Sequence, residues 1–172
     1  MQLKDLKQKI ENSKEFKELK SQNKEFEPCV SFLILDISKN QEVYSLDYKC
    51  QENIFSFSIK NTDKDNIEVL KQEILDKSKK LNAFQTNISE INLDIPELLP
   101  LVQKEFEKNK INKKIDKIIA ILQQTSKGLV WQLTVIAEAF TIFLINFDAQ
   151  TKQTLKFEKK SLFDFARPAG SL

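Results

Sequence analysis

The feature that most constrains this chain is an internal period of 87 residues. The segments that coincide after this shift are residues 32–35 with 119–122, residues 42–46 with 129–133, and Phe55 and Phe57 with Ile142 and Leu144. A period of this kind sets the architecture before any local element is assigned. The sequence therefore predicts two similar halves, and this prediction by itself says nothing about function.

Composition and charge exclude several classes of protein. The chain has 172 residues, which is enough to bury a core in one domain or in two small ones. Its 27 basic and 25 acidic residues are interspersed, also in the lysine-rich stretches 4–24 and 104–117, so no long-range positive field favours nucleic acid. Residues 1–20 lack the apolar region of a signal peptide, and no apolar run approaches ~18 residues. We expect a cytoplasmic protein that binds neither nucleic acid nor membrane.

The first half is expected to be a helix, three strands and a second helix. Leu3, Leu6 and Ile10 recur at helical spacing and predict a helix over 3–24. Strands are expected from alternating apolar and polar residues over 29–37, 43–50 and 54–60. Short turns between them favour an antiparallel meander. The spacing of Ile67, Leu70 and Ile74 predicts a helix over 66–80.

The second half begins with a clear helix start. Asp94 followed by Glu97 fits a capping box, and prolines fall in the first turn or close to it. Before it, residues 82–92 read as a linker with a short strand near 86–88. Four strands are expected after the helix, over 115–123, 129–136, 140–147 and 154–159. Helices separate from runs of antiparallel strands indicate an α+β fold, with helices packed on one face of the sheet.

A family resemblance follows from three features of the second half. A capped helix at Asp94, Trp131 in a middle strand and the turn Asp148-Ala149-Gln150-Thr151 resemble the PepSY domain family over about residues 88–160. The first half looks like a diverged copy, and the shape is similar to cystatin-like folds. The family usually has Gly after the Thr, where a positive φ is favoured, so Lys152 is expected to adopt that conformation here. The resemblance implies a non-catalytic role in restraining peptidases or mediating contacts, with no catalytic residues to carry over.

Composition argues against catalysis and against cofactors. The chain contains no His, which removes Ser-His-Asp and Cys-His catalysis and the usual imidazole metal ligands. Two glycines cannot build a phosphate-binding loop, and two cysteines alone cannot make a structural zinc site. Asp148 has the most apolar surroundings of any carboxylate, which a turn-forming role explains. We therefore expect no enzyme activity, no cofactor and no metal.

The two cysteines flank the first predicted hairpin, so their positions across it can be compared. If Lys39 and Asn40 form the centre of the first hairpin turn, Cys29 and Cys50 face each other across two strands. A cross-strand disulfide is then within reach. In an intracellular protein the alternative, two reduced thiols, is the expected state.

The strand over 140–147 is apolar on both faces, which a sheet with helices on one side only does not need. Either a part of this chain or a second chain must cover the other face, and a symmetric dimer is one form of the second case. The expected interaction surface comprises Phe140, Ile142, Leu144, Phe163 and Phe165.

Together these observations predict an α+β protein made of two PepSY/cystatin-like repeats of antiparallel meanders. Its expected parts are a first α-βββ-α repeat over 1–82, a second α-ββββ repeat over 88–162 and a tail over 163–172, forming one compact unit. The expected function is a non-catalytic protein-interaction or regulatory module that binds an unknown protein or itself. The alternative is a small-molecule or lipid-binding domain with a pocket between helix and sheet. Trp131, Tyr44 and Tyr48 are expected to belong to the core rather than to a ligand site.

Overall fold

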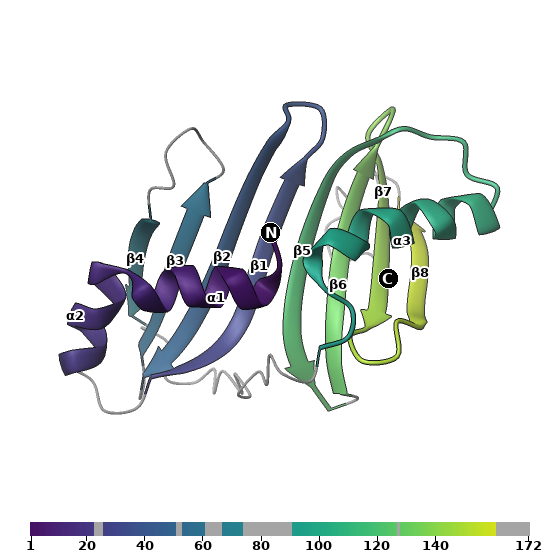
Figure 1. Ribbon diagram of the computed structural model, residues 1–172. Helices are drawn as coiled ribbons and strands as arrows, with labels where there is room; N and C mark the ends of the chain where they lie inside the picture. Colours follow the sequence, from purple (N-terminus) through teal and green to yellow (C-terminus); the bar gives the residue numbers. More distant parts are fainter. Residues whose placement is uncertain (23–25, 51–52, 61–66, 74–90, 127, 161–172) are drawn as a thin grey trace, which may run out of the picture.

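The computed structural model describes residues 1–22, 26–50, 53–60, 67–73, 91–126 and 128–160. Within these residues, three helices and eight strands follow one another along the chain (Figure 1). The elements are α1 (Leu3–Asn12), α2 (Lys14–Gln22), β1 (Glu27–Asp36), β2 (Gln41–Cys50), β3 (Asn53–Lys60), β4 (Ile67–Glu73), α3 (Ile95–Lys108), β5 (Ile115–Thr125), β6 (Gly128–Ala137), β7 (Thr141–Asp148) and β8 (Thr154–Lys160). No helix in the described part of the chain combines the length and the apolar character needed to span a membrane.

All eight strands belong to one antiparallel sheet with the order β4-β3-β2-β1-β5-β6-β7-β8. Strands that follow one another in each half are also neighbours in space, and β1 pairs with β5 to join the halves. The three helices lie on the same face of this sheet, α1 over the first half and α3 over the second (Figure 1). The α+β class and the antiparallel sheet with helices on one face are therefore confirmed.

The core lies between the helices and the sheet. Helix α1 buries Leu3, Leu6 and Ile10 at the helical spacing that the sequence shows. Helix α3 likewise buries Leu98, Val102 and Phe106. Each side chain of this kind contributes about 1.5–3 kcal/mol when it leaves water, so apolar burial holds both helices on the sheet.

The expected single helix over 3–24 is divided at Ser13. The ψ angle of Ser13 is 155°, which is extended, and its Oγ accepts a hydrogen bond from the N–H of Phe16 at 3.1 Å. Ser13 thereby caps the start of α2. The change of direction explains why Phe16, which lies off the apolar stripe of α1, is nevertheless buried.

The expected helix over 66–80 is wrong for Ile67–Glu73, which form β4 and pair with β3 from Asn53 to Ile59. The apolar residues at positions 67, 69 and 70 fit the period of a helix as well as that of a strand. The segment is a strand because it pairs along the whole length of β4 with β3. The first half thus contains a fourth strand in place of the predicted α-βββ-α order. Residues 74–80 and the predicted short strand near 86–88 lie outside the described residues.

The two halves correspond at a shift of 87 residues only up to the second strand of each half. Phe55 and Phe57 are buried on the helix side, whereas Ile142 and Leu144 point to the opposite side of the sheet. Two residues separate the paired ends Cys50 and Asn53, and three separate Ala137 and Thr141. One extra residue in a hairpin loop moves every following side chain to the other face. Phe143 and Ile145 therefore take the buried positions in β7.

Candidate functional site

The predicted capping box is present at the start of α3. The Asp94 carboxylate accepts a hydrogen bond from the N–H of Ile95 at 2.6 Å, and the Glu97 carboxylate accepts one from the N–H of Asp94 at 3.1 Å. These bonds satisfy backbone donors that a helix start otherwise leaves without a partner.

Trp131 and the Asp148-Ala149-Gln150-Thr151 turn meet at this same helix start. The Trp131 Nε1–H donates to the Leu93 carbonyl at 2.8 Å, and the Ala149 carbonyl accepts from the N–H groups of Asn92 and Leu93, both at 2.9 Å. Trp131 is fully buried, as are Tyr44 and Tyr48, so the prediction that these aromatics belong to the core is confirmed. The residues that carry the PepSY resemblance thus hold the start of α3 against the sheet.

The turn itself is built by its acidic residue. Asp148 Oδ1 accepts hydrogen bonds from the N–H groups of Gln150 at 2.9 Å and Thr151 at 2.7 Å, and the bond from Thr151 in particular lowers the pKa of Asp148. Lys152 has a φ of 64°, the positive value that was expected there. Its ammonium group pairs with Glu97, which ties the turn to α3.

Asp94 serves a second helix as well. Its Oδ1 also accepts a hydrogen bond from the N–H of Leu3 at 2.9 Å, across 91 residues of sequence. Gln2, which precedes α1, makes no side-chain cap of its own. Helices α1 and α3 start close together in the middle of the molecule and run in opposite directions (Figure 1). Both positive helix ends therefore share one carboxylate.

The face of the sheet turned away from the helices is apolar along its centre; we call it the back face. Phe32 pairs with Ile121, and Ile34 with Ile119, where β1 and β5 join the halves. No helix or strand among the described residues lies over this face (Figure 1). Its aliphatic and aromatic side chains, all half-buried or buried, are Val30, Phe32, Ile34, Val43, Ile54, Ile119, Ile121, Val130, Ile136, Ile142 and Leu144.

The structure brings together only part of the predicted interaction surface. Ile142 and Leu144 lie on the back face, paired with Ile136 and Thr134 of β6. Phe140 lies in the turn before β7, where its side chain is 74% exposed. Phe163 and Phe165 lie outside the described residues.

A carboxylate lies at one side of the back face and was not singled out from the sequence. Asp47 pairs with Val30 on one side and with Ser56 on the other. Burial raises the pKa of Asp47, and a hydrogen bond from Ser56 partly offsets this effect. Its Oδ1 is buried with no hydrogen-bond partner among the described residues. Alternation marked Asp47 as the polar face of a strand, and nothing in the sequence distinguished it from an exposed residue.

The predicted opposition of Cys29 and Cys50 is wrong. Pro28 pairs with Tyr48 and Val30 with Asp47, so Cys29 forms a bulge, and Cys50 pairs with Asn53 of β3. The turn between β1 and β2 is centred one residue earlier than expected. The residue opposite each position of β1 therefore lies at least two positions earlier in β2 than predicted. Both cysteines are buried and reduced. Burial and the nearby Asp47 raise the pKa of Cys29 to about 11.

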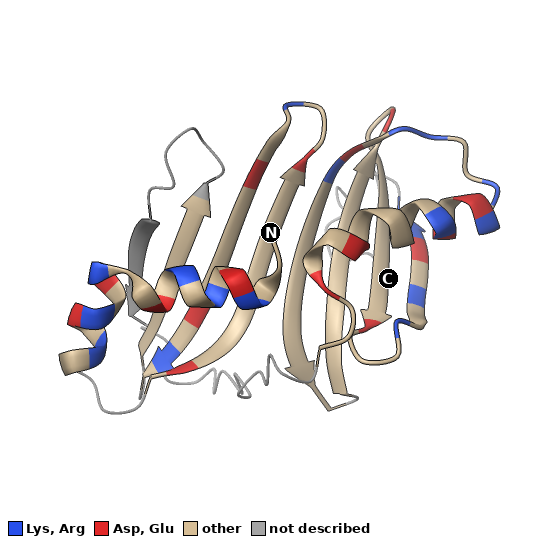
Figure 2. Ribbon diagram, viewed as in Figure 1, with Lys and Arg blue, Asp and Glu red and all other residues tan. Residues whose placement is uncertain are grey.

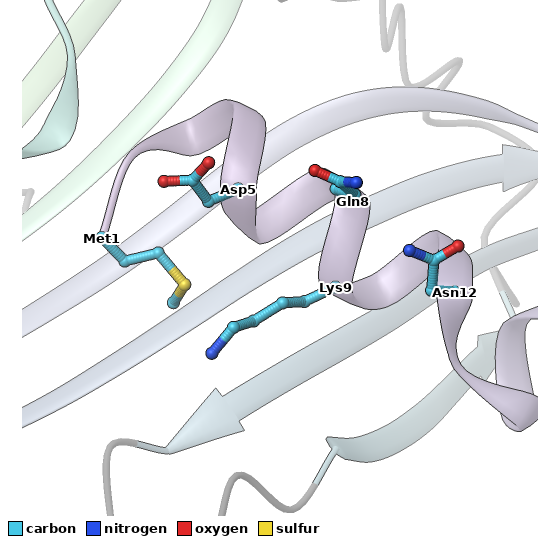
Figure 3. A pocket seen from close by; sticks show the side chains of 5 residues that line it. All are labelled: Met1, Asp5, Gln8, Lys9 and Asn12. Atoms are coloured by element: carbon cyan, nitrogen blue, oxygen red, sulfur yellow. The ribbon is translucent and has the colours of Figure 1, made fainter.

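Two open grooves lie on the helix side. One, of about 520 Å³, runs along α1 and is lined by Met1, Asp5, Gln8, Lys9 and Asn12 (Figure 3). The other, of about 530 Å³, lies between the C-terminal part of α3 and the ends of β1 and β5. We call this second one the α3 groove. Trp131 lines neither, so the aromatic pocket considered from the sequence is not found at these two grooves.

Acidic and basic residues occur together on the three helices, whereas most residues of the described strands are uncharged (Figure 2). No group of three or more acidic or cysteine side chains that could hold a metal occurs among the described residues. The pairing with Lys117 lowers the pKa of Asp36, and the pairing with Lys152, followed by the helix cap, lowers the pKa of Glu97. The hydrogen bonds within the turn lower the pKa of Asp148.

Comparison with known proteins shows a similarity of fold. No family model and no curated protein matches the chain, so the PepSY resemblance stays a prediction. Among solved structures, the chain is similar to the crystal structure of a "putative lipoprotein" from Clostridium difficile 630, with 17% sequence identity and a TM-score of 0.56. The match covers 85% of this chain and 90% of that one. At a sequence identity this low, the similarity shows that the two proteins share an α+β fold, and it shows nothing about function.

Proposed function

We propose that the chain is a non-catalytic protein-binding module of PepSY-like type, and that the back face is its binding surface. The observation that carries this proposal is the distribution of apolar side chains. Helices cover one side of the sheet, and a band of aliphatic residues runs along the other. The side chains of this band are half-buried or buried, yet no described helix or strand covers them. Apolar surface of this kind usually marks contacts with other proteins.

The rim of the back face suits such a contact. Asp36 and Lys117 form an ion pair at 2.9 Å at one end of the band. Ser58 and Gln132 flank its centre, in line with the Phe32–Ile121 pair. An apolar centre with a polar rim is the usual composition of a protein interface. The partner is a second copy of this chain or another protein.

Duplication of one PepSY-like unit accounts for the arrangement. The sheet order is mirrored about the β1–β5 pair, and each half contributes four consecutive strands. Allowing one additional residue in the second hairpin loop, Phe55, Phe57 and Ile59 correspond to Phe143, Ile145 and Phe147, which are all buried. The proposal includes two repeats joined into one sheet.

Native mass spectrometry of protein purified from its own cells tests the binding role. We expect the chain to travel with a partner protein or as a multiple of its own mass. Leu144→Lys, which places a charge on the back face, should abolish that complex. The matched control is Leu155→Lys on β8, where the side chain is already 49% exposed and outside the apolar band. A complex that survives Leu144→Lys, or a bare monomer in the wild type, would count against the proposal.

A further inference from the structure

The α3 groove differs from the back face in shape and in its charge. Its floor is made by Leu99 and Phe106 of α3, by Ile111 and by two residues at strand ends, Ile37 and Ile115. Its volume of about 530 Å³ falls in the range of small-molecule sites, which is about 300–1,000 Å³. The Ile37 side chain is 36% exposed, so apolar surface is accessible from the open side.

The polar side chains that line this groove are exposed, apart from the half-buried Lys113, and we take them as its rim. They are Gln103 and Glu107 of α3 and Asn112, Lys113 and Lys114 of the segment that leads into β5. The floor offers no hydrogen-bonding side chain, so a ligand that fills it needs an apolar body with its polar group at one end only. The lining includes two lysines and one glutamate, so its net charge favours a negative group.

The two rim lysines differ in how strongly they are engaged. The Lys113 ammonium donates to the Glu138 carbonyl at a long 3.3 Å, whereas Lys114 is exposed. Lys117, slightly further along, is paired with Asp36. Lys114 is therefore the cation best placed to meet an incoming anion.

We propose that the α3 groove binds a single-chain carboxylate amphiphile, with the acyl chain on the apolar floor and the carboxylate at Lys114. The site lies on the helix side of the sheet, so it is independent of protein binding at the back face. The ligand is a monomeric fatty acid taken from solution rather than a membrane surface.

Dodecanoate, added below the concentration at which it forms micelles, is the probe. Chemical shifts of backbone amides should change at Leu99, Phe106 and Ile111 and stay constant at Ile142 on the back face. Dodecyltrimethylammonium, which has the same chain and a cationic head, should bind about tenfold more weakly because the rim then repels it. Similar affinity for both heads would overturn the role of Lys114.

Two pairs of variants separate the site from general effects on the fold. Lys114→Glu should weaken dodecanoate binding about tenfold, whereas Lys104→Glu, on α3 and outside the groove, should change it less than about twofold. Leu99→Asn should weaken binding about fivefold, and the matched control is Leu101→Asn, a half-buried leucine of α3 that does not line the groove. Thermal unfolding shows whether the leucine variants fold, and the exposed lysine variants test the site if they do not. Equal effects of site and control variants, or shifts spread over the back face, would overturn the inference.

Discussion

The two halves of the sheet hold their helices in different ways. In the second half, the start of α3 is fixed by hydrogen bonds from its own half, through Trp131, Ala149 and the pair of Glu97 and Lys152. In the first half, the first backbone donor of α1 bonds to Asp94, which belongs to the other half. The second half thus contains its own helix anchor, whereas the first half depends on its neighbour.

Aromatic packing takes the place of this polar anchor in the first half. Phe16 of α2 lies 4.8 Å from Tyr48 and 5.4 Å from Phe57, measured between ring centroids, and Phe26 packs on the same tyrosine. Aromatic pairs of this kind contribute about 0.5–1.5 kcal/mol each beyond the area that they bury. Phe106 of α3 likewise packs on Phe143, with 4.7 Å between the ring centroids. The difference therefore teaches that packed rings hold the helices of both halves, and that the second half adds directional bonds from its own strands.

Replacing the central aromatic of each half should give the largest contrast. Trp131→Phe removes the hydrogen bond to Leu93 and leaves a buried void, and we expect a loss of about 2–3 kcal/mol in the free energy of unfolding. Tyr48→Phe removes only a 3.2 Å bond to Glu11 on α1 and should cost about 1 kcal/mol or less. Urea unfolding measures both. Equal losses would mean that the two anchors do not differ.

Asp94 offers the next largest effect, because it links the halves. Asp94→Ala leaves two helix starts without a cap, and we expect a loss of about 1–2 kcal/mol. Hydrogen exchange should quicken at the amides of both Leu3 and Ile95. Asp5→Ala is the control, since Asp5 lies in the first turn of α1 without capping it. Faster exchange at Ile95 alone would show that α1 does not depend on the second half.

The carboxylate on the back face should respond to pH in a predictable direction. Because burial raises the pKa of Asp47 in the folded state, its ionisation destabilises the fold as pH rises through that value. Asp47→Asn should therefore stabilise the protein by about 1 kcal/mol at pH 7, with a smaller gain at pH 4.5. Urea unfolding at the two pH values provides the measurement.

Ser56 supplies a check on the same site. Ser56→Ala removes the hydroxyl that donates to Asp47 and should lower stability at pH 7 more than at pH 4.5. Ser58→Ala, one position along the same face of β3, should show no such pH dependence. A gain from Asp47→Asn that does not depend on pH would contradict the assignment.

The smallest effect is expected at Lys152, where two contributions oppose each other. Lys152→Gly relieves about 1 kcal/mol of strain at a φ of 64° but removes the ion pair with Glu97, so we expect a net change below about 0.5 kcal/mol. In a Glu97→Gln background the same change should stabilise the fold, as followed by thermal unfolding. Destabilisation in both backgrounds would mean that the lysine contributes more than its pairing.

The sequence sufficed for those elements whose signals are local. Asp94 and Glu97, three residues apart, indicate a capped helix, and the alternation in β6 identifies its inward face, with Trp131, Leu133 and Val135 buried. In β8 the same reasoning put Leu155 beside Phe157, but Leu155 is 49% exposed. The break at Ser13 was missed because a serine at an apolar position fits a continuous helix as well as a new cap. β4 was predicted as a helix because its apolar residues fit both the helical and the strand period, and only its pairing with β3 makes it a strand. The burial of Asp47 and the bulge at Cys29 depend on neighbouring strands, which no single segment encodes.

The carboxylate shared by α1 and α3 has a consequence for the order in which the chain folds during synthesis. Leu3 leaves the ribosome early, yet the oxygen that accepts its amide hydrogen lies 91 residues later. Until Asp94 has emerged, α1 lacks that cap and depends on the contacts within its own half. We expect α1 to reach its final stability only after Asp94 has been made, although the residues of α1 are made before it.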